Sequence, residues 1–115
     1  MNTMLVKGNL YPIKDIISYV KGNIERGDDF CIYGESDEDL LSNKSYYIDD
    51  YPDVDDNGKE IYPPLVLKKK LNYLYSGQQF ADVIDSVIDQ KPLATTDEFI
   101  KALNYYSEYD NFLDL

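Results

Sequence analysis

Two segments in the last third of the chain carry the same start signal for an α-helix. Ser76 is followed three residues later by Gln79, and Thr95 by Glu98. Each pair forms a capping box, in which two side chains satisfy the free N–H groups of a helix start. Apolar residues recur at helical spacing behind both boxes. The sequence therefore predicts helices over residues 77–90 and 96–109.

A third amphipathic helix is predicted near the start of the chain. Pro12 is typical of a first helical turn, and Gly27 closes the segment. The apolar residues between them follow one helical stripe, formed by Ile13, Ile16, Ile17, Val20 and Ile24. We expect this helix to span residues 12–26.

Short runs of strand-forming residues lie between the first helix and the last two. They predict strands near residues 29–33, 45–50 and 61–67. Between the last two runs lies Asn57-Gly58, a strong hairpin signal, because a type I′ turn needs positive φ at both central residues. We therefore expect a hairpin with acidic residues at its tip.

The order of helix, strands, helix and helix predicts an α+β fold. We expect residues 1–115 to form a single small domain, with a short antiparallel sheet covered by about three amphipathic helices. The hydrophobic share of 43% is enough for one modest core. No apolar run approaches the roughly 20 residues of a membrane span. With one cysteine, no internal disulfide can form, and a reducing cytoplasm is the expected compartment.

Negative charge is concentrated in one third of the chain. Residues 28–60 contain 12 of the 22 acidic residues and two lysines, a net charge of −10, whereas the other 82 residues contain 10 acidic and nine basic residues. Such a surface repels nucleic acids and anionic membranes and attracts basic proteins. A surface that only promotes solubility is the alternative.

Part of this acidic segment matches the opening of a calcium-binding EF-hand loop. Asp53, Asp55, Asn57 and Gly58 occupy the first, third, fifth and sixth positions. The twelfth position requires a bidentate Glu, but here it is Pro64, which has no side-chain oxygen. A calcium-binding module is therefore the weaker alternative.

Residues for common catalytic sites are missing from the sequence. The chain has no histidine, and its only cysteine, Cys31, lies in an apolar run. We interpret Cys31 as a buried structural thiol. With 22 carboxylates, a close acidic pair is no sign of acid–base catalysis. We expect a protein without catalytic residues, metal or cofactor.

The C-terminal third resembles a family of small acidic bacterial immunity proteins. The likeness lies in Gly77 to Ile84, Gln90-Lys91-Pro92, Ala102 to Tyr106 and Asp110-Asn111-Phe112, with a fainter echo in the acidic segment ending at Tyr62-Pro63. Members of that family belong to polymorphic toxin systems, including contact-dependent growth inhibition. The resemblance implies a cytoplasmic, non-catalytic antidote that binds one toxin as a monomer. It implies a basic toxin domain, typically a nuclease, and binding to neither nucleic acid nor membrane.

The predicted toxin-binding residues are ten acidic residues and tyrosines in the acidic segment or next to it. Tyrosines are included because they are enriched at interface hot spots. A second hypothesis also uses the negative charge: the protein is a nucleic-acid mimic that inhibits a DNA-binding defence protein. This hypothesis requires carboxylates spaced along a rod-like surface. The predicted binding residues are Asp37, Glu38, Asp39, Asp49, Asp50, Tyr51, Asp53, Asp55, Asp56 and Tyr62.

Overall fold

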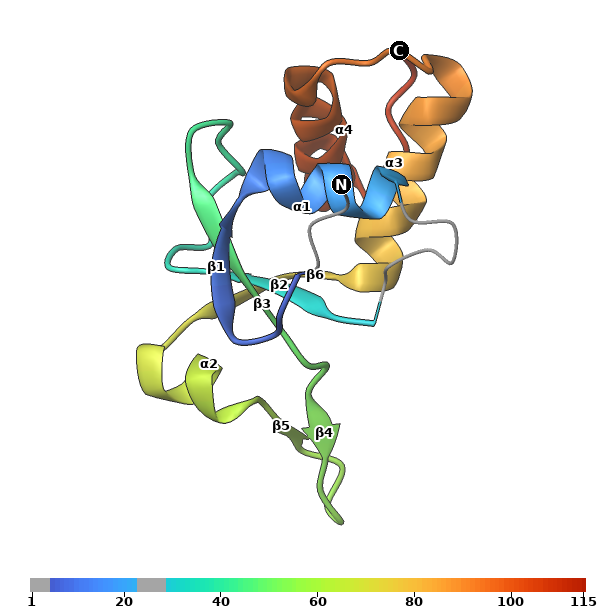
Figure 1. Cartoon of the computed structure of the whole chain (residues 1–115). Coiled ribbons are helices and arrows are strands. Elements are labelled where there is room, and N and C mark those ends of the chain that lie inside the picture. The colour runs from blue at the N-terminus through green and yellow to red at the C-terminus, as the bar shows by residue number, and fades with distance from the viewer. Residues whose placement is uncertain (1–4, 23–28) are drawn as a thin grey trace.

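A four-stranded antiparallel sheet lies at the centre of the computed structural model, which describes residues 5–22 and 29–115. Its strand order is β1-β3-β2-β6 (Figure 1). Each adjacent pair is antiparallel, and β3 lies between β1 and β2. The strands are β1 (Asn9–Pro12), β2 (Cys31–Gly34), β3 (Ser45–Asp49) and β6 (Asn72–Ser76).

Three helices cover one face of this sheet. They are α1 (Ile13–Gly22), α3 (Gly77–Gln90) and α4 (Thr96–Tyr109) (Figure 1). Their apolar stripes meet Ile32, Tyr46 and Ile48 of the sheet in the main hydrophobic core. Both capping boxes are formed, since the side chains of Ser76 and Thr95 accept hydrogen bonds from the backbone N–H groups of the residues three positions later.

The opposite face of the sheet has a smaller apolar cluster under a short helix, α2 (Pro64–Lys69). Side chains alternate between the two faces along a strand, so Cys31 and Tyr33 point to this side while Ile32 points to the main core. Val66 of α2 packs on Cys31 and Tyr33. Because β2 is buried on both faces, its sequence is a continuous apolar run rather than an alternating one.

A second, two-stranded sheet is formed by β4 (Asp53–Val54) and β5 (Glu60–Ile61). Figure 1 shows this hairpin projecting from the body on the side away from α3 and α4. The Asp55 N–H donates to the Lys59 carbonyl (2.9 Å), and the Gly58 N–H donates to the Asp55 carbonyl (3.0 Å). The loop therefore has three residues, with Gly58 at positive φ (80°).

The structure confirms the predicted fold class, a small α+β domain with an antiparallel sheet. It also confirms the predicted bounds of α3 and α4, and the burial of Cys31. The first helix begins at Ile13, because Pro12 is the last residue of β1. Its expected end at residues 23–26 lies outside the described residues.

Three details of the predicted hairpin are wrong. The segment 45–50 pairs with β1 and β2, and the expected strand 61–67 ends at Ile61 and continues into α2. Pro64 starts this helix at a first-turn position, where its missing N–H costs nothing. The turn is also not type I′, because Asn57 does not have positive φ.

Over the described ranges, no helix combines the length and hydropathy that crossing a membrane requires.

Candidate partner-binding surface

The predicted binding residues occupy three separate places in the fold. Asp37, Glu38 and Asp39 lie in the loop between β2 and β3. A second group, residues 49–51, lies at the end of β3, and the remaining residues lie in or next to the β4–β5 hairpin. Only the first and third groups present carboxylates on segments outside the packed layers.

The loop between β2 and β3 is fastened to α4 by one side chain. The Leu40 N–H donates to Asn104 Oδ1 (2.8 Å), and Asn104 Nδ2 donates to the Leu40 carbonyl (3.1 Å). The next residue, Leu41, donates its N–H to the Tyr46 hydroxyl (2.9 Å). These bonds fix the C-terminal side of the loop and so determine where the three preceding acidic residues lie.

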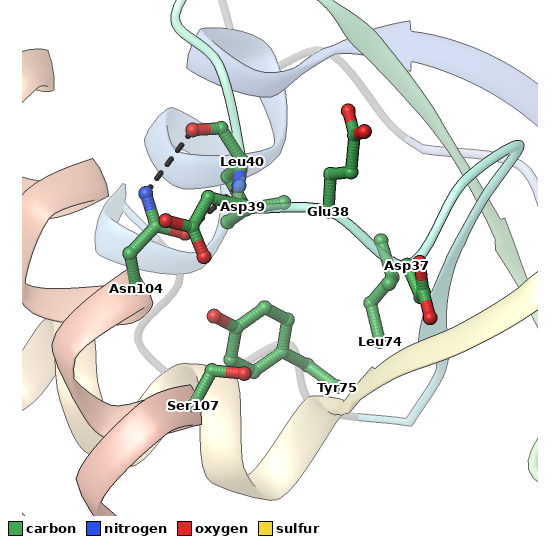
Figure 2. Close-up of a pocket in the computed structure, with 8 residues that line it drawn as sticks. All are labelled: Asp37, Glu38, Asp39, Leu40, Leu74, Tyr75, Asn104 and Ser107. Carbon is green, nitrogen blue, oxygen red and sulfur yellow. Dashed lines mark hydrogen bonds between the residues drawn. The ribbon is translucent and has the colours of Figure 1, made fainter.

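A shallow hollow of about 30 Å³ lies between this loop and α4, with room for on the order of one water molecule. Figure 2 shows Asp39 on the Asn104 side of the hollow, and the Glu38 carboxylate pointing away from Tyr75 and Ser107. The Tyr75 hydroxyl is already bonded to the Leu103 carbonyl (2.6 Å). The hollow is therefore too small for a small-molecule ligand, and the Tyr75 hydroxyl already has a hydrogen-bond partner. The acidic side chains of the loop belong to the outer surface.

The acidic residues at the end of β3 have structural partners. Asp49 is only 8% exposed, and its Oδ1 accepts a hydrogen bond from the Asp50 N–H (2.8 Å). Asp50 forms an ion pair with Lys7 (2.7 Å), and its carbonyl accepts a bond from the buried Tyr33 hydroxyl (2.8 Å). The hydrogen bond to Asp50 raises the pKa of Lys7. The Tyr51 hydroxyl accepts a bond from the Gln78 N–H (3.2 Å) at the start of α3.

Asp55 is the structural centre of the hairpin turn. Its Oδ1 accepts hydrogen bonds from the N–H groups of Asn57 and Lys59, both at 2.9 Å. Asp53 and Asp56 are exposed on the same hairpin. Of these three carboxylates, Asp55 is the one that shapes the turn, and Asp53 and Asp56 are the better candidates for contact with a partner.

Tyr62 connects the hairpin to the body. Its hydroxyl donates to Glu60 Oε2 (2.8 Å), and this hydrogen bond raises the pKa of Tyr62. Its ring lies edge-on to Tyr33, with ring centroids 6.3 Å apart, and is tilted against Tyr73 at 6.4 Å. Aromatic pairs in such arrangements stabilise a fold by more than the burial of their surface area alone. Tyr62 is therefore an anchor of the hairpin as well as a half-buried surface residue.

Several residues that matter for this surface were not predicted from the sequence. Asn104 is the clamp of the acidic loop, and its only signal is a polar residue among the apolar positions of α4. Val54 and Ile61 are exposed aliphatic residues of the hairpin, at 65% and 47%. The visible signal for them was two aliphatic residues that flank an acidic run.

Cys31 and Tyr33 offer no reactive group to this surface. Both are fully buried, and burial is the main cause that raises the pKa of each. A thiol held protonated in this way is a poor nucleophile. Within residues 5–22 and 29–115, no three His, Cys, Asp or Glu side chains are grouped so that they could hold a metal ion.

The fold and this surface define a small α+β domain that presents acidic side chains on a loop and on a projecting hairpin. The chain belongs to the family described as Domain of unknown function (DUF7716), whose sequence profile matches residues 12–115. No curated protein and no solved structure matches the chain.

Proposed function

We propose that this protein is a non-catalytic, cytoplasmic immunity protein that binds and neutralises one basic toxin domain, a nuclease, through its acidic surface. The observation that carries the proposal is the projecting β4–β5 hairpin. It places Asp53 and Asp56 at exposed positions outside both hydrophobic clusters. Carboxylates in such a place contribute little to the core and are available to a partner.

The negative charge of this surface is complementary to the positive charge of a nuclease cleft. A nuclease binds phosphates through basic side chains, and carboxylates can occupy the positions of those phosphates. The concentration of charge in residues 28–60 would also steer a basic partner toward this side of the molecule. The acidic loop at residues 37–39 would either extend the contact area or only attract the basic partner through its negative electrostatic potential.

The first test is the identity of the partner. The full chain serves as bait in the bacterium that encodes it, and mass spectrometry identifies what co-purifies. We expect a basic protein encoded by the adjacent upstream reading frame. Its expression alone should stop growth of a laboratory host, and co-expression of this chain should restore growth. An upstream housekeeping gene, with no toxic basic partner captured, would overturn the proposal.

The second test uses charge reversal with a matched control. One variant carries Asp53→Lys and Asp56→Lys and leaves Asp55 in place, because Asp55 closes the turn. A second variant reverses Asp37, Glu38 and Asp39. The control carries Glu108→Lys and Asp114→Lys, two exposed positions outside the acidic segment with the same change in net charge as the first variant.

We expect the hairpin variant to lose protection while the control retains it. If a folded protein with both acidic groups reversed still protects cells, the acidic surface is not the binding site. Capture of a DNA-binding defence protein would instead favour the nucleic-acid mimic. The separation of the two acidic groups, one beside α4 and one on the hairpin, gives that alternative no support.

A further inference from the structure

The two ladder pairs of the β4–β5 hairpin have the same composition, one on each face. In the ladder, Asp53 lies opposite Ile61, and Val54 lies opposite Glu60. Residues directly opposite each other in an antiparallel pair are on the same face. One face therefore carries Asp53 and Ile61, and the other carries Val54 and Glu60. Each face has one carboxylate next to one aliphatic side chain.

Both aliphatic side chains remain accessible to solvent. Val54 is 65% exposed and Ile61 is 47% exposed. No third strand joins this ribbon in the part of the chain that the structure describes. A lone two-stranded hairpin gains little stability in water, so the apolar area of these two residues stays available for contact with a partner.

Lysine and arginine are the side chains that fit such a surface. Each has an apolar stem that can lie on an aliphatic side chain, and a charged head that can reach a neighbouring carboxylate. Residues 53–61, which we call the hairpin arm, contain four acidic residues and one lysine, a net charge of −3. Charge complementarity therefore selects a partner with basic side chains.

We infer that the hairpin arm inserts into a cleft of the partner that is lined by lysine and arginine side chains, so that both faces of the arm become buried. The inference rests on the proposed function and adds that the cleft is filled directly. A flat contact would cover one face only and leave the other aliphatic residue in water. Figure 1 shows the arm projecting from the body of the domain, and Val54 and Ile61, one on each face, are both exposed.

Photo-crosslinking from the two faces tests this inference. A benzophenone amino acid is placed in turn at Val54, at Ile61 or at Leu93 of the full chain, and each variant is irradiated in the bacterium that encodes it. Leu93 is 91% exposed and lies between α3 and α4, so it serves as the control. We expect positions 54 and 61 to link to the same basic protein, at peptides on opposite walls of one cleft, and position 93 not to link.

The outcomes separate this inference from the proposed function. Links from only one face, or from Leu93 as strongly as from the arm, overturn insertion although a toxin partner remains. Links from both faces to a protein without toxic activity support insertion but overturn the immunity role. Absence of a specific link from any position overturns both.

Affinity measurements with the purified cross-linked protein provide the second readout. Val54→Ser and Ile61→Ser should each raise the dissociation constant by about tenfold, because each removes apolar area buried in the complex. Leu93→Ser should leave the dissociation constant unchanged. The melting temperature should stay the same in all three variants, since none of these residues is in the core. An effect of Val54→Ser alone, or of Ile61→Ser alone, would contradict insertion.

Discussion

The carboxylate of Asp55 shapes the hairpin turn through two backbone hydrogen bonds. We expect Asp55→Ala to increase the hydrogen-exchange rates of the Asn57 and Lys59 amides roughly fivefold, which corresponds to a net bond worth of about 1 kcal/mol. Asp55→Asn keeps a side-chain acceptor and should leave both rates near those of the parent. The melting temperature should change in neither variant, because the turn lies outside the core. Equal exchange rates in the parent and in Asp55→Ala would show that the turn does not depend on this side chain.

The same carboxylate bears on the calcium alternative. Asp55 occupies the third position of the partial EF-hand match, but its Oδ1 already accepts two N–H groups. The hairpin also places Asp53 in a strand, whereas an EF-hand loop joins two helices. The local sequence is therefore better explained by the needs of the turn.

Two tyrosines with raised pKa values make stability fall at alkaline pH. Burial raises the pKa of Tyr75 to about 12, and partial desolvation raises the pKa of Tyr73, which is 40% exposed, to about 12; the ordinary value is 10.0. The unfolded chain thus loses these protons first, and their contribution to stability is fully present below pH 10 and is lost as the pH rises toward 12. We expect the free energy of unfolding, measured with urea, to be steady up to about pH 9 and to fall between about pH 10 and 12.

Tyr75→Phe and Tyr109→Phe form the matched pair for this pH effect. Tyr75→Phe should cost about 1 kcal/mol at neutral pH, because the bond to the Leu103 carbonyl is lost, and should reduce the alkaline fall. Tyr109 is 59% exposed, and its substitution should do neither. If Tyr75→Phe left the alkaline fall unchanged, Tyr75 would not be one of the groups responsible for it.

At the scale of elements, local signals determined what could be predicted. The bounds of α3 and α4 could be predicted because capping boxes at Ser76 and Thr95 act within four residues of the helix start. Helix α2 could not, since the proline pair before Leu65 is compatible with a strand edge, a turn or a helix start. Only the apolar cluster with Cys31 and Tyr33, distant in sequence, favours the helix, because it buries Val66.

The candidate site was predictable to a similar degree. The excess of acidic residues locates the surface, because charge is a property of composition. Tertiary contacts decide which of these carboxylates are exposed: Asp49 is buried, Asp50 is exposed but pairs with Lys7, and Asp53 and Asp56 are exposed on the hairpin. The contact with Lys7 crosses more than 40 residues of sequence and leaves no local pattern.

The loop between β2 and β3 depends on the Asn104 clamp of α4. Asn104→Ala removes both bonds to the Leu40 backbone, and we expect a loss of about 1–2 kcal/mol in the free energy of unfolding. Amide exchange at Leu40 should rise more than exchange in the sheet. Lys101→Ala, at an exposed position of the same helix, is the control and should change neither. Equal stability of Asn104→Ala and the parent would show that other contacts hold the acidic loop.

At the scale of the whole molecule, the sheet is covered on both faces by unequal layers. Three helices bury the main core on one face, whereas α2 and Tyr62 cover the small cluster on the other. Leu103→Asp places a charge at a fully buried position of the main core and should abolish cooperative unfolding at 25 °C. The same substitution at the exposed Leu93 should have almost no effect on circular dichroism or melting. A Leu103→Asp variant that melts like the parent would show that the three helices do not share this core.

The charge distribution of the whole molecule leads to the last prediction, which concerns the rate of binding to the captured basic partner. If the acidic surface steers that partner, the association rate measured by stopped flow should fall by about tenfold or more between 0.1 M and 1 M salt, where the screening length shortens from about 10 Å to about 3 Å. Reversal of Asp37, Glu38 and Asp39 should mainly lower this association rate at low salt. Val54→Ser should instead raise the dissociation rate at every salt concentration, because the lost contact is apolar. An association rate that does not respond to salt would mean that the net charge of −10 in residues 28–60 has no part in recognition.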